Sequence, residues 1–252
     1  MSKRVIGMKR RFFLLAAALF FSTATITAQT SEDNNSVSKN KIRQNVEVFT
    51  KFNTMQDYEP SFFSATAVYN LLGPKFSASG GIFLQKGDTQ LTVSAKYKFY
   101  HTDKLSLGTG VTYNLNVLHK YSISNNFLPG FYLDWQPKPF YSLEFDIDFL
   151  VKFRSLFVFS QYARPLVNTT MGGRLKNTFY LPKDISLYIE FASIEDFRYM
   201  IFCAPSFIFG SEFTVNEKFD IGVEAAVHYI DFFTLSAHYE DTDFRLGVRY
   251  KW

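Results

Sequence analysis

Apolar and polar residues alternate with a period of two along most of the chain beyond residue 44. The clearest segment runs from Tyr141 to Phe153, where every odd-numbered residue is apolar and the even-numbered residues include three carboxylates. The same division recurs at 90–99, 184–192 and 218–229. Successive side chains of a β-strand point to opposite faces of its sheet, so this pattern predicts strands with one apolar and one polar face.

Short clusters of Gly, Pro, Asn, Asp and Lys separate these segments, such as LGPK at 72–75 and QPKP at 136–139. These residue types favour turns, because they tolerate or impose the backbone angles that a chain reversal needs. No window shows helical spacing of apolar residues over more than two turns. The chain is therefore predicted to be all-β.

Alternation alone does not distinguish a soluble β-sandwich from a membrane barrel, since both have two-faced strands. The aromatic content favours the barrel: 30 Phe and 15 Tyr crowd the apolar faces, whereas a sandwich core must mix large and small residues to pack closely. The polar faces mix small residues with charges of both signs, which suits an aqueous lumen. The segments also have about the 9–11 residues that a membrane-crossing strand needs.

The first 28 residues are typical of a cleaved signal peptide. Lys9, Arg10 and Arg11 form a basic region, an apolar run follows at 12–21, and a small and polar cleavage region ends near Ala28. The apolar run is about half the ~20 residues of a spanning helix. We therefore expect a signal peptide at 1–28, a flexible polar lead-in at 29–43 and a barrel domain at 44–252.

Cleavage changes the charge of the protein. Residues 1–28 contain five basic and no acidic residues, so the formal charge falls from +4 to −1. This argues against nucleic acid as a partner. The single cysteine, Cys203, excludes an internal disulfide, and its distance from the cleavage region argues against a lipoprotein.

The last ten residues alternate in the same way and end on an aromatic side chain. One face carries Phe244, Leu246, Val248, Tyr250 and Trp252, and the other carries charged residues and one glycine. This segment resembles the C-terminal signature of bacterial outer-membrane β-barrel proteins, which implies recognition by the barrel-assembly machinery and contact with outer-membrane lipids. The cleavage region, with Ala28 before Gln29, is similar to that of many exported proteins of Bacteroidetes.

The resemblance implies a closed antiparallel up-and-down transmembrane β-barrel. Counting every break gives fourteen segments from Ser61 to Trp252 and one more at 44–52, although the turns at 152–155, 203–206 and 229–231 have weak signals. Since single-chain barrels have an even number of strands, we expect twelve to fourteen, with ten as the alternative.

A periplasmic Trp252 would place alternate turns outside the cell. Counted backwards, these are EDTD at 240–243, NEK at 216–218, SIED at 193–196, 164–173, QPKP, HTDK at 101–104 and LLGPK at 71–75. Outer loops this short argue against an adhesin or receptor.

Charged residues on the polar faces are candidates for lining the lumen. They are Glu144, Asp146, Asp148, Lys96, Lys98, Lys176, Arg245 and Arg249. Opposed charges across a narrow lumen would either form ion pairs that stiffen it or create a field that orients a polar solute. No His or Cys lies beside the carboxylates at ligand spacing, and no nucleotide loop is visible, so neither a metal nor a cofactor is predicted.

Histidines are the natural starting point for an enzymatic alternative. His228 and His238 fall on the polar faces of neighbouring predicted strands, with Glu224 and Ser236 on the same faces. A Ser/His/Glu group would suit a lipid-modifying hydrolase, and a carboxylate pair a protease, but any two polar faces bring such residues together.

The sequence therefore predicts an outer-membrane barrel reached by signal-dependent export, and no enzyme. It favours either a passive pore for small polar solutes or a structural barrel of the envelope. The alternatives are a barrel enzyme and a non-conducting component of a secretion or envelope complex.

Overall fold

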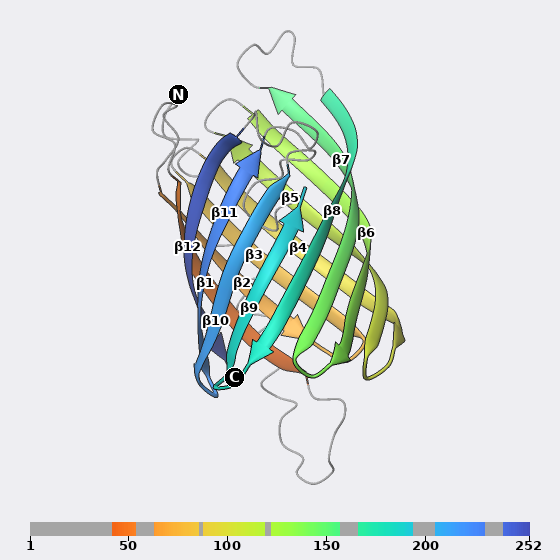
Figure 1. The fold of residues 1–252 in the computed structure, drawn as a ribbon. Helices are drawn as coiled ribbons and strands as arrows, with labels where there is room; N and C mark the ends of the chain where they lie inside the picture. Colours follow the sequence, from red (N-terminus) through yellow and green to blue (C-terminus); the bar gives the residue numbers. More distant parts are fainter. Residues whose placement is uncertain are drawn as a thin grey trace. The chain divides into compact units, whose positions relative to one another are not determined.

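In a computed structural model, the described residues are 42–53, 63–85, 88–118, 122–156, 166–193, 205–229 and 239–252 (Figure 1). They form one closed barrel of twelve antiparallel strands. The strands are β1 (Arg43–Asn53), β2 (Phe63–Leu72), β3 (Phe76–Gln85), β4 (Asp88–His101), β5 (Leu105–Leu118), β6 (Ser122–Lys138), β7 (Tyr141–Leu156), β8 (Leu166–Leu181), β9 (Ile185–Ala192), β10 (Ser206–Asn216), β11 (Phe219–Tyr229) and β12 (Tyr239–Lys251).

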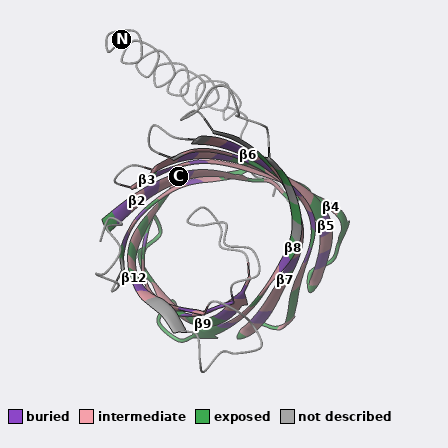
Figure 2. Ribbon diagram, turned by 90° about the horizontal axis from the view of Figure 1, so that it is seen from above, coloured by how far each residue is buried: buried purple, intermediate pink, exposed green. Residues whose placement is uncertain are grey.

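Each strand pairs with its neighbours in the sequence, and β12 pairs with β1 to close the ring (Figure 2). At this seam Val48 lies opposite Val248 and Glu47 opposite Arg249. The all-β prediction and the expected range of strand number are therefore confirmed, with twelve as the number. The proposed signal peptide at 1–28 and most of the lead-in lie outside the described residues.

The two ends of the barrel differ in their connections. The terminal rim holds the start of β1, Trp252 and the short turns at 73–75, 102–104, 139–140, 182–184 and 217–218. The loop rim, at the opposite end, is formed by the other ends of the strands, such as Asn53 and Phe63, Ala192 and Ser206, and Tyr229 and Tyr239. Most residues of the loop-rim connections lie outside the described ranges.

The sequence-based assignment of turns to the two ends is wrong for LGPK, HTDK, QPKP and NEK, which lie at the same rim as Trp252. The error comes from predicted turns at 152–155 and 240–243, through which β7 and β12 pass unbroken. Charged residues there occupy strand positions, as Lys152 and Asp243 do, opposite Asn168 and Ala226. The argument from short outer loops therefore fails.

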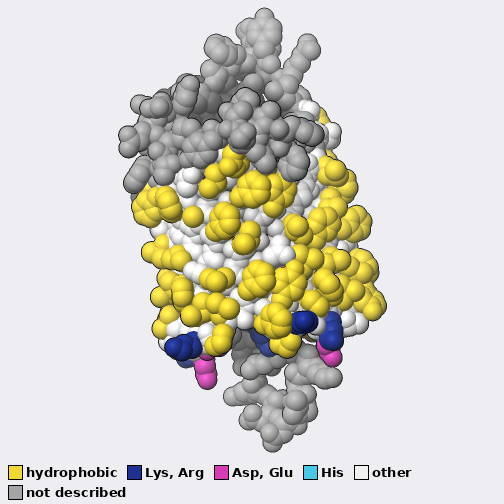
Figure 3. Space-filling view, in the orientation of Figure 1, with side chains coloured by type: hydrophobic (Ala, Val, Ile, Leu, Met, Phe, Trp, Pro, Cys, Tyr) yellow, Lys and Arg dark blue, Asp and Glu magenta, His cyan; other side chains and the backbone are white. Residues whose placement is uncertain are grey.

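The outer surface of the barrel is apolar. Large side chains with between 36% and 61% of their surface exposed occur on all twelve strands, among them Val93, Phe131, Met171 and Trp252. On the face shown in Figure 3, hydrophobic side chains cover the described part of the wall, and Lys, Arg, Asp and Glu appear only at its lower edge. A band of this kind matches the hydrocarbon layer of a membrane.

Candidate functional site

The inward side chains divide the lumen into two walls. The uncharged wall covers β2 and β3 and the loop-rim parts of β4, β5 and β6. Apart from Asp88 at the loop rim, its inward polar residues are uncharged and lie opposite one another on neighbouring strands: Ser64, Thr66, Asn70, Ser77, Ser79, Gln85, Gln90, Thr92, Ser94, Thr112, Asn114, Asn116, Ser124 and Asn126. Hydroxyl and amide groups therefore line this side, and several of them are almost fully buried.

The charged wall covers β7 to β12 and β1. It consists of Glu144, Asp146, Asp148, Arg174, Lys176, Glu190, Glu212, Asp220, Glu224, Asp243, Arg245, Arg249, Lys251, Glu47 and Lys51, again joined by register. Six of the eight lumen candidates named from the sequence lie here. The other two, Lys96 and Lys98, are inward on β4 near the terminal rim.

Arg174 organises the part of the charged wall on β7 and β8. Its Nε donates to Asp146 Oδ2 at 2.9 Å, its Nη2 forms an ion pair with the same oxygen, and Glu144 lies 3.7 Å away. Lys96 reaches Asp146 from β4 at 3.8 Å. Glu144 and Asp146 of the predicted acidic ladder are thus neutralised by bases on nearby strands.

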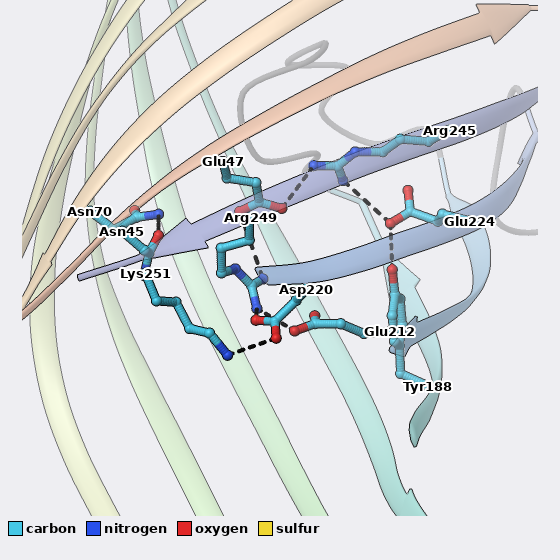
Figure 4. Close-up of polar contacts among 10 residues, drawn as sticks. All are labelled: Asn45, Glu47, Asn70, Tyr188, Glu212, Asp220, Glu224, Arg245, Arg249 and Lys251. Atoms are coloured by element: carbon cyan, nitrogen blue, oxygen red, sulfur yellow. Dashed lines mark hydrogen bonds and ion pairs between the residues drawn. The ribbon is translucent and has the colours of Figure 1, made fainter. Parts of the chain in front are cut away.

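Three bases on β12 organise the other part of this wall (Figure 4). Arg249 forms ion pairs with Glu212, with Asp220 at 3.5 Å and with Glu47 at 3.7 Å. Lys251 Nζ donates to Asp220 Oδ1 at 2.7 Å. All these partners stand on β1, β10 and β11, so the pairs run along the wall rather than across the lumen.

Arg245 lies on the same face of β12 as Arg249, two inward positions closer to the loop rim. Its Nη1 lies 3.3 Å from Glu224 Oε2, its Nη2 lies 3.7 Å from Glu47, and its guanidinium stacks 3.3 Å from the ring centre of Phe49. Such a network fixes the positions of its members, because each charge has several partners within reach.

Two tyrosines lie flat against the wall over glycines of the neighbouring strand. A Cβ atom at Gly210 would lie 2.1 Å from the Tyr188 ring, and one at Gly108 would lie 2.2 Å from the Tyr132 ring. Across Gly210, the Tyr188 hydroxyl donates to Glu224 at 2.7 Å (Figure 4). The glycines therefore let long side chains bridge next-but-one strands without filling the lumen.

The charged wall faces a cavity of about 210 Å³. β1, β2 and β8 to β12 line this cavity, so it extends from the charged wall to the edge of the uncharged wall. Its charged lining consists of Glu47, Glu190, Glu212, Asp220, Glu224, Arg174, Lys176, Arg245 and Arg249. The arrangement can hold a small polar solute among charges of both signs.

His228 joins a hydrogen-bonded chain nearer the loop rim. Its Nδ1 lies 2.9 Å from Ser206 Oγ and its Nε2 lies 2.8 Å from Asp243 Oδ2, which also forms an ion pair with Lys51. All four residues are between 2% and 6% exposed. This chain crosses β10, β11, β12 and β1, and therefore crosses the seam of the barrel.

The other residues of the enzymatic hypothesis do not join this group. Glu224 stands four residues from His228 on β11 and contacts Tyr188 and Arg245 instead. Ser236 and His238 lie outside the described residues. Within the described strands, no three His, Cys, Asp or Glu side chains are arranged to hold a metal ion.

The predicted assembly signal lies on the outer face of β12. Phe244, Leu246, Val248, Tyr250 and Trp252 are between 36% and 53% exposed. Trp252 Nε1 donates to Gln44 Oε1 at 3.0 Å, and Tyr69 OH donates to the same oxygen at 2.9 Å. The terminal residue therefore fastens β12 to β1 at the terminal rim.

The sequence analysis missed Arg174, Tyr188 and Ser206 as members of these clusters. Arg174 and Tyr188 carry a usable signal, since each follows the alternation of its strand onto the polar face. Their partners depend on strand register, which alternation does not specify.

Comparison with known proteins identifies the fold. No protein-family model matches the chain. No curated protein matches it either. Among solved structures it is similar to the KdgM porin, with a TM-score of 0.57 and 11% identity over 82% of this chain and 99% of that one. It is also similar to the NanC porin, with a TM-score of 0.56 and 12% identity over 82% of this chain and 100% of that one. At this identity the likeness shows a shared barrel fold.

Proposed function

We propose that the protein is a passive pore for small polar solutes in the bacterial outer membrane. The observation that carries this proposal is the cavity of about 210 Å³ inside an apolar-coated barrel, faced by charged side chains that remain partly exposed. Arg249 and Glu212 each keep 30% of their side-chain surface exposed, and Glu47 keeps 26%. Charged rings and columns of this kind govern the passage of ions and polar solutes through pores. The porins KdgM and NanC have the same architecture, which supports this reading.

Single-channel recording tests the pore directly. The barrel would be purified from membranes, checked for its folded form by the mobility shift on heating, and inserted into planar bilayers. We expect discrete conductance steps. A folded barrel that gives none would overturn the pore and favour a structural role in the envelope.

Placement in the outer membrane has its own test. Trp252 fastens the seam through Gln44, so deletion of Trp252 should reduce the amount of folded barrel in the outer-membrane fraction. Unchanged insertion would contradict the role that we give this residue in assembly.

The second candidate function is acyl hydrolysis at Ser206. The observation that favours it is the Ser206–His228–Asp243 chain, since a serine hydroxyl next to a histidine held by a carboxylate is the arrangement of many acyl hydrolases. Two features argue against it: Lys51 forms an ion pair with Asp243, and Ser206 is only 4% exposed. We expect no labelling of the folded barrel by a fluorophosphonate probe. Labelling that Ser206→Ala abolishes would establish the hydrolase.

A further inference from the structure

Four basic side chains line the cavity, and one of them differs from the others in its contacts. Arg174, Arg245 and Arg249 each have carboxylates within 4.0 Å. Lys176 has none among the described residues, although Glu144 and Glu190 stand beside it in register. Its ammonium group lies instead over the ring of Tyr188, 4.3 Å from the ring centre. Lys176 is thus the lining cation whose charge is least compensated.

Tyr188 is held rigidly in the position that this contact requires. Its ring lies over Gly210, where a Cβ atom would approach within 2.1 Å of the ring and 2.3 Å of its hydroxyl oxygen. Its hydroxyl donates to Glu224, which Arg245 holds in turn (Figure 4). The ring therefore offers one face to the glycine backbone and the other to the ammonium group, and a cation over an aromatic face is attracted without losing its charge.

The other tyrosine on a glycine provides a comparison within the same molecule. Lys96 lies over the Tyr132 ring at 5.0 Å, but it also has Asp146 at 3.8 Å. The charge of Lys96 is therefore compensated by a carboxylate, and Lys96 does not line the cavity. In both places a lysine lies over a tyrosine that packs on a glycine. The two differ because a carboxylate lies within 4.0 Å of Lys96 and none of the described carboxylates lies this close to Lys176.

The carboxylates of the cavity do not cancel this availability. Glu47, Glu212, Asp220 and Glu224 all lie within 4.0 Å of Arg245, Arg249 or Lys251. The fifth, Glu190, is 9% exposed and lines the cavity beside Lys176, but no ion pair within 4.0 Å joins these two described residues. Locally paired charges contribute little at a distance, so an unpaired ammonium group dominates the potential beside it.

We propose that Lys176 is the residue that binds an oxyanion group, a carboxylate or phosphate, of a small solute in the lumen, and that Tyr188 is its positioning residue. This inference rests on the proposed pore and names the chemistry that the pore selects.

Recordings on the Lys176→Gln variant test the proposal. Two quantities are measured: the permeability ratio of potassium to chloride from the reversal potential in a KCl gradient, and the inorganic phosphate concentration that halves the KCl current. Loss of one uncompensated charge a few ångströms from the ion path should raise both by roughly threefold. Lys176→Arg keeps the charge and should retain wild-type values.

A matched control removes the same charge elsewhere. Lys104 is exposed in the β4–β5 turn and does not line the cavity, so Lys104→Gln should change neither quantity. An equal change in Lys104→Gln would overturn the proposal, because net charge rather than a site would then explain the effect.

The positioning role of Tyr188 is tested by two variants. Tyr188→Phe keeps the ring over Gly210 and should keep wild-type phosphate block, whereas Tyr188→Leu should approach Lys176→Gln. Equal phosphate block in the wild type, Tyr188→Phe and Tyr188→Leu would overturn the role of Tyr188.

A wild-type barrel that never conducts overturns the pore itself. A conducting barrel that Lys176→Gln leaves unchanged overturns only the oxyanion site.

Discussion

The charged and the uncharged walls of the lumen are built on the same backbone and differ in how their side chains are satisfied. On the charged wall, Arg174, Arg245 and Arg249 each hold two or three carboxylates, and the contacts extend over two to four strands. On the uncharged wall, contacts such as Ser79 to Ser94 at 2.7 Å join only adjacent strands. Long charged side chains therefore connect distant strands, and short neutral ones do not.

Both walls contain buried oxygen atoms that have no hydrogen-bond partner among the described residues. They are Ser124 Oγ and Asn116 Oδ1 on the uncharged wall and Asp243 Oδ1 on the charged wall. A neutral hydroxyl left in this way destabilises a protein by about 1–3 kcal/mol, whereas a buried charge that loses its partner costs about 3–5 kcal/mol. Stability should therefore depend on the charged wall far more than on the uncharged one.

The largest expected effect comes from Lys51, which is 5% exposed and forms an ion pair with Asp243, itself 2% exposed. Lys51→Met leaves the Asp243 carboxylate buried with His228 as its one partner among the described side chains, so it should lower the free energy of unfolding by about 4 kcal/mol. Urea titration of the barrel in lipid vesicles measures this. The control is Lys51→Met combined with Asp243→Leu, which removes both charges and should restore most of the stability. A double variant as unstable as the single one would contradict the ion-pair explanation.

A smaller effect is expected at Gly130, where β6 meets the charged wall. A Cβ atom there would lie 1.8 Å from Asp148 Oδ1 and 2.6 Å from the backbone oxygen of Ile147. Since the backbone cannot yield as a side chain does, Gly130→Ala should destabilise the barrel by about 3 kcal/mol. Gly222→Ala provides the comparison, because its Cβ atom would meet nothing closer than 3.9 Å. The folded fraction recovered from membranes checks both, and equal losses would show that the collision is not the cause.

Substitution of Arg249 should destabilise the barrel less than substitution of Lys51, because 30% of the Arg249 side chain is exposed. Arg249→Met leaves Glu47, Glu212 and Asp220 facing one another, and we expect a loss of about 1–2 kcal/mol. This repulsion is screened by ions, so the loss should shrink in 1 M salt. Urea titration at low and high salt checks this, and a loss independent of salt would mean that packing rather than charge is responsible.

The alternation of residues was sufficient to predict an all-β barrel and the face that a side chain occupies within its strand. It placed Glu144, Asp146 and Lys176 on inward positions because a period of two is a property of single strands. It could not identify Arg174 as the partner of Asp146, nor Ser206 as the partner of His228. These pairs depend on the register between strands, which the pattern of one strand leaves open.

A second limit explains the wrong assignment of turns. EDTD at 240–243 has the composition of a turn, and the turn predicted at 152–155 rests mostly on segment length, yet Lys152 and Asp243 lie at inward strand positions. In a barrel with a polar lumen, a cluster of charges signals either a turn or an inward face. Strand length decides between them, and β7 and β12 are longer than the minimum for a membrane crossing.

The smallest effect is expected on the uncharged wall, at Ser124, which is 1% exposed. Its hydroxyl has no hydrogen-bond partner among the described residues, so Ser124→Ala removes a desolvated polar group and no contact. The free energy of unfolding should rise by up to about 1 kcal/mol or stay the same. Urea titration of Ser124→Ala and Lys51→Met in the same experiment measures the smallest and the largest of the expected changes in the free energy of unfolding. A loss above 1 kcal/mol in Ser124→Ala would mean that this hydroxyl is bonded in the membrane, and that the two walls are satisfied more equally than their described contacts imply.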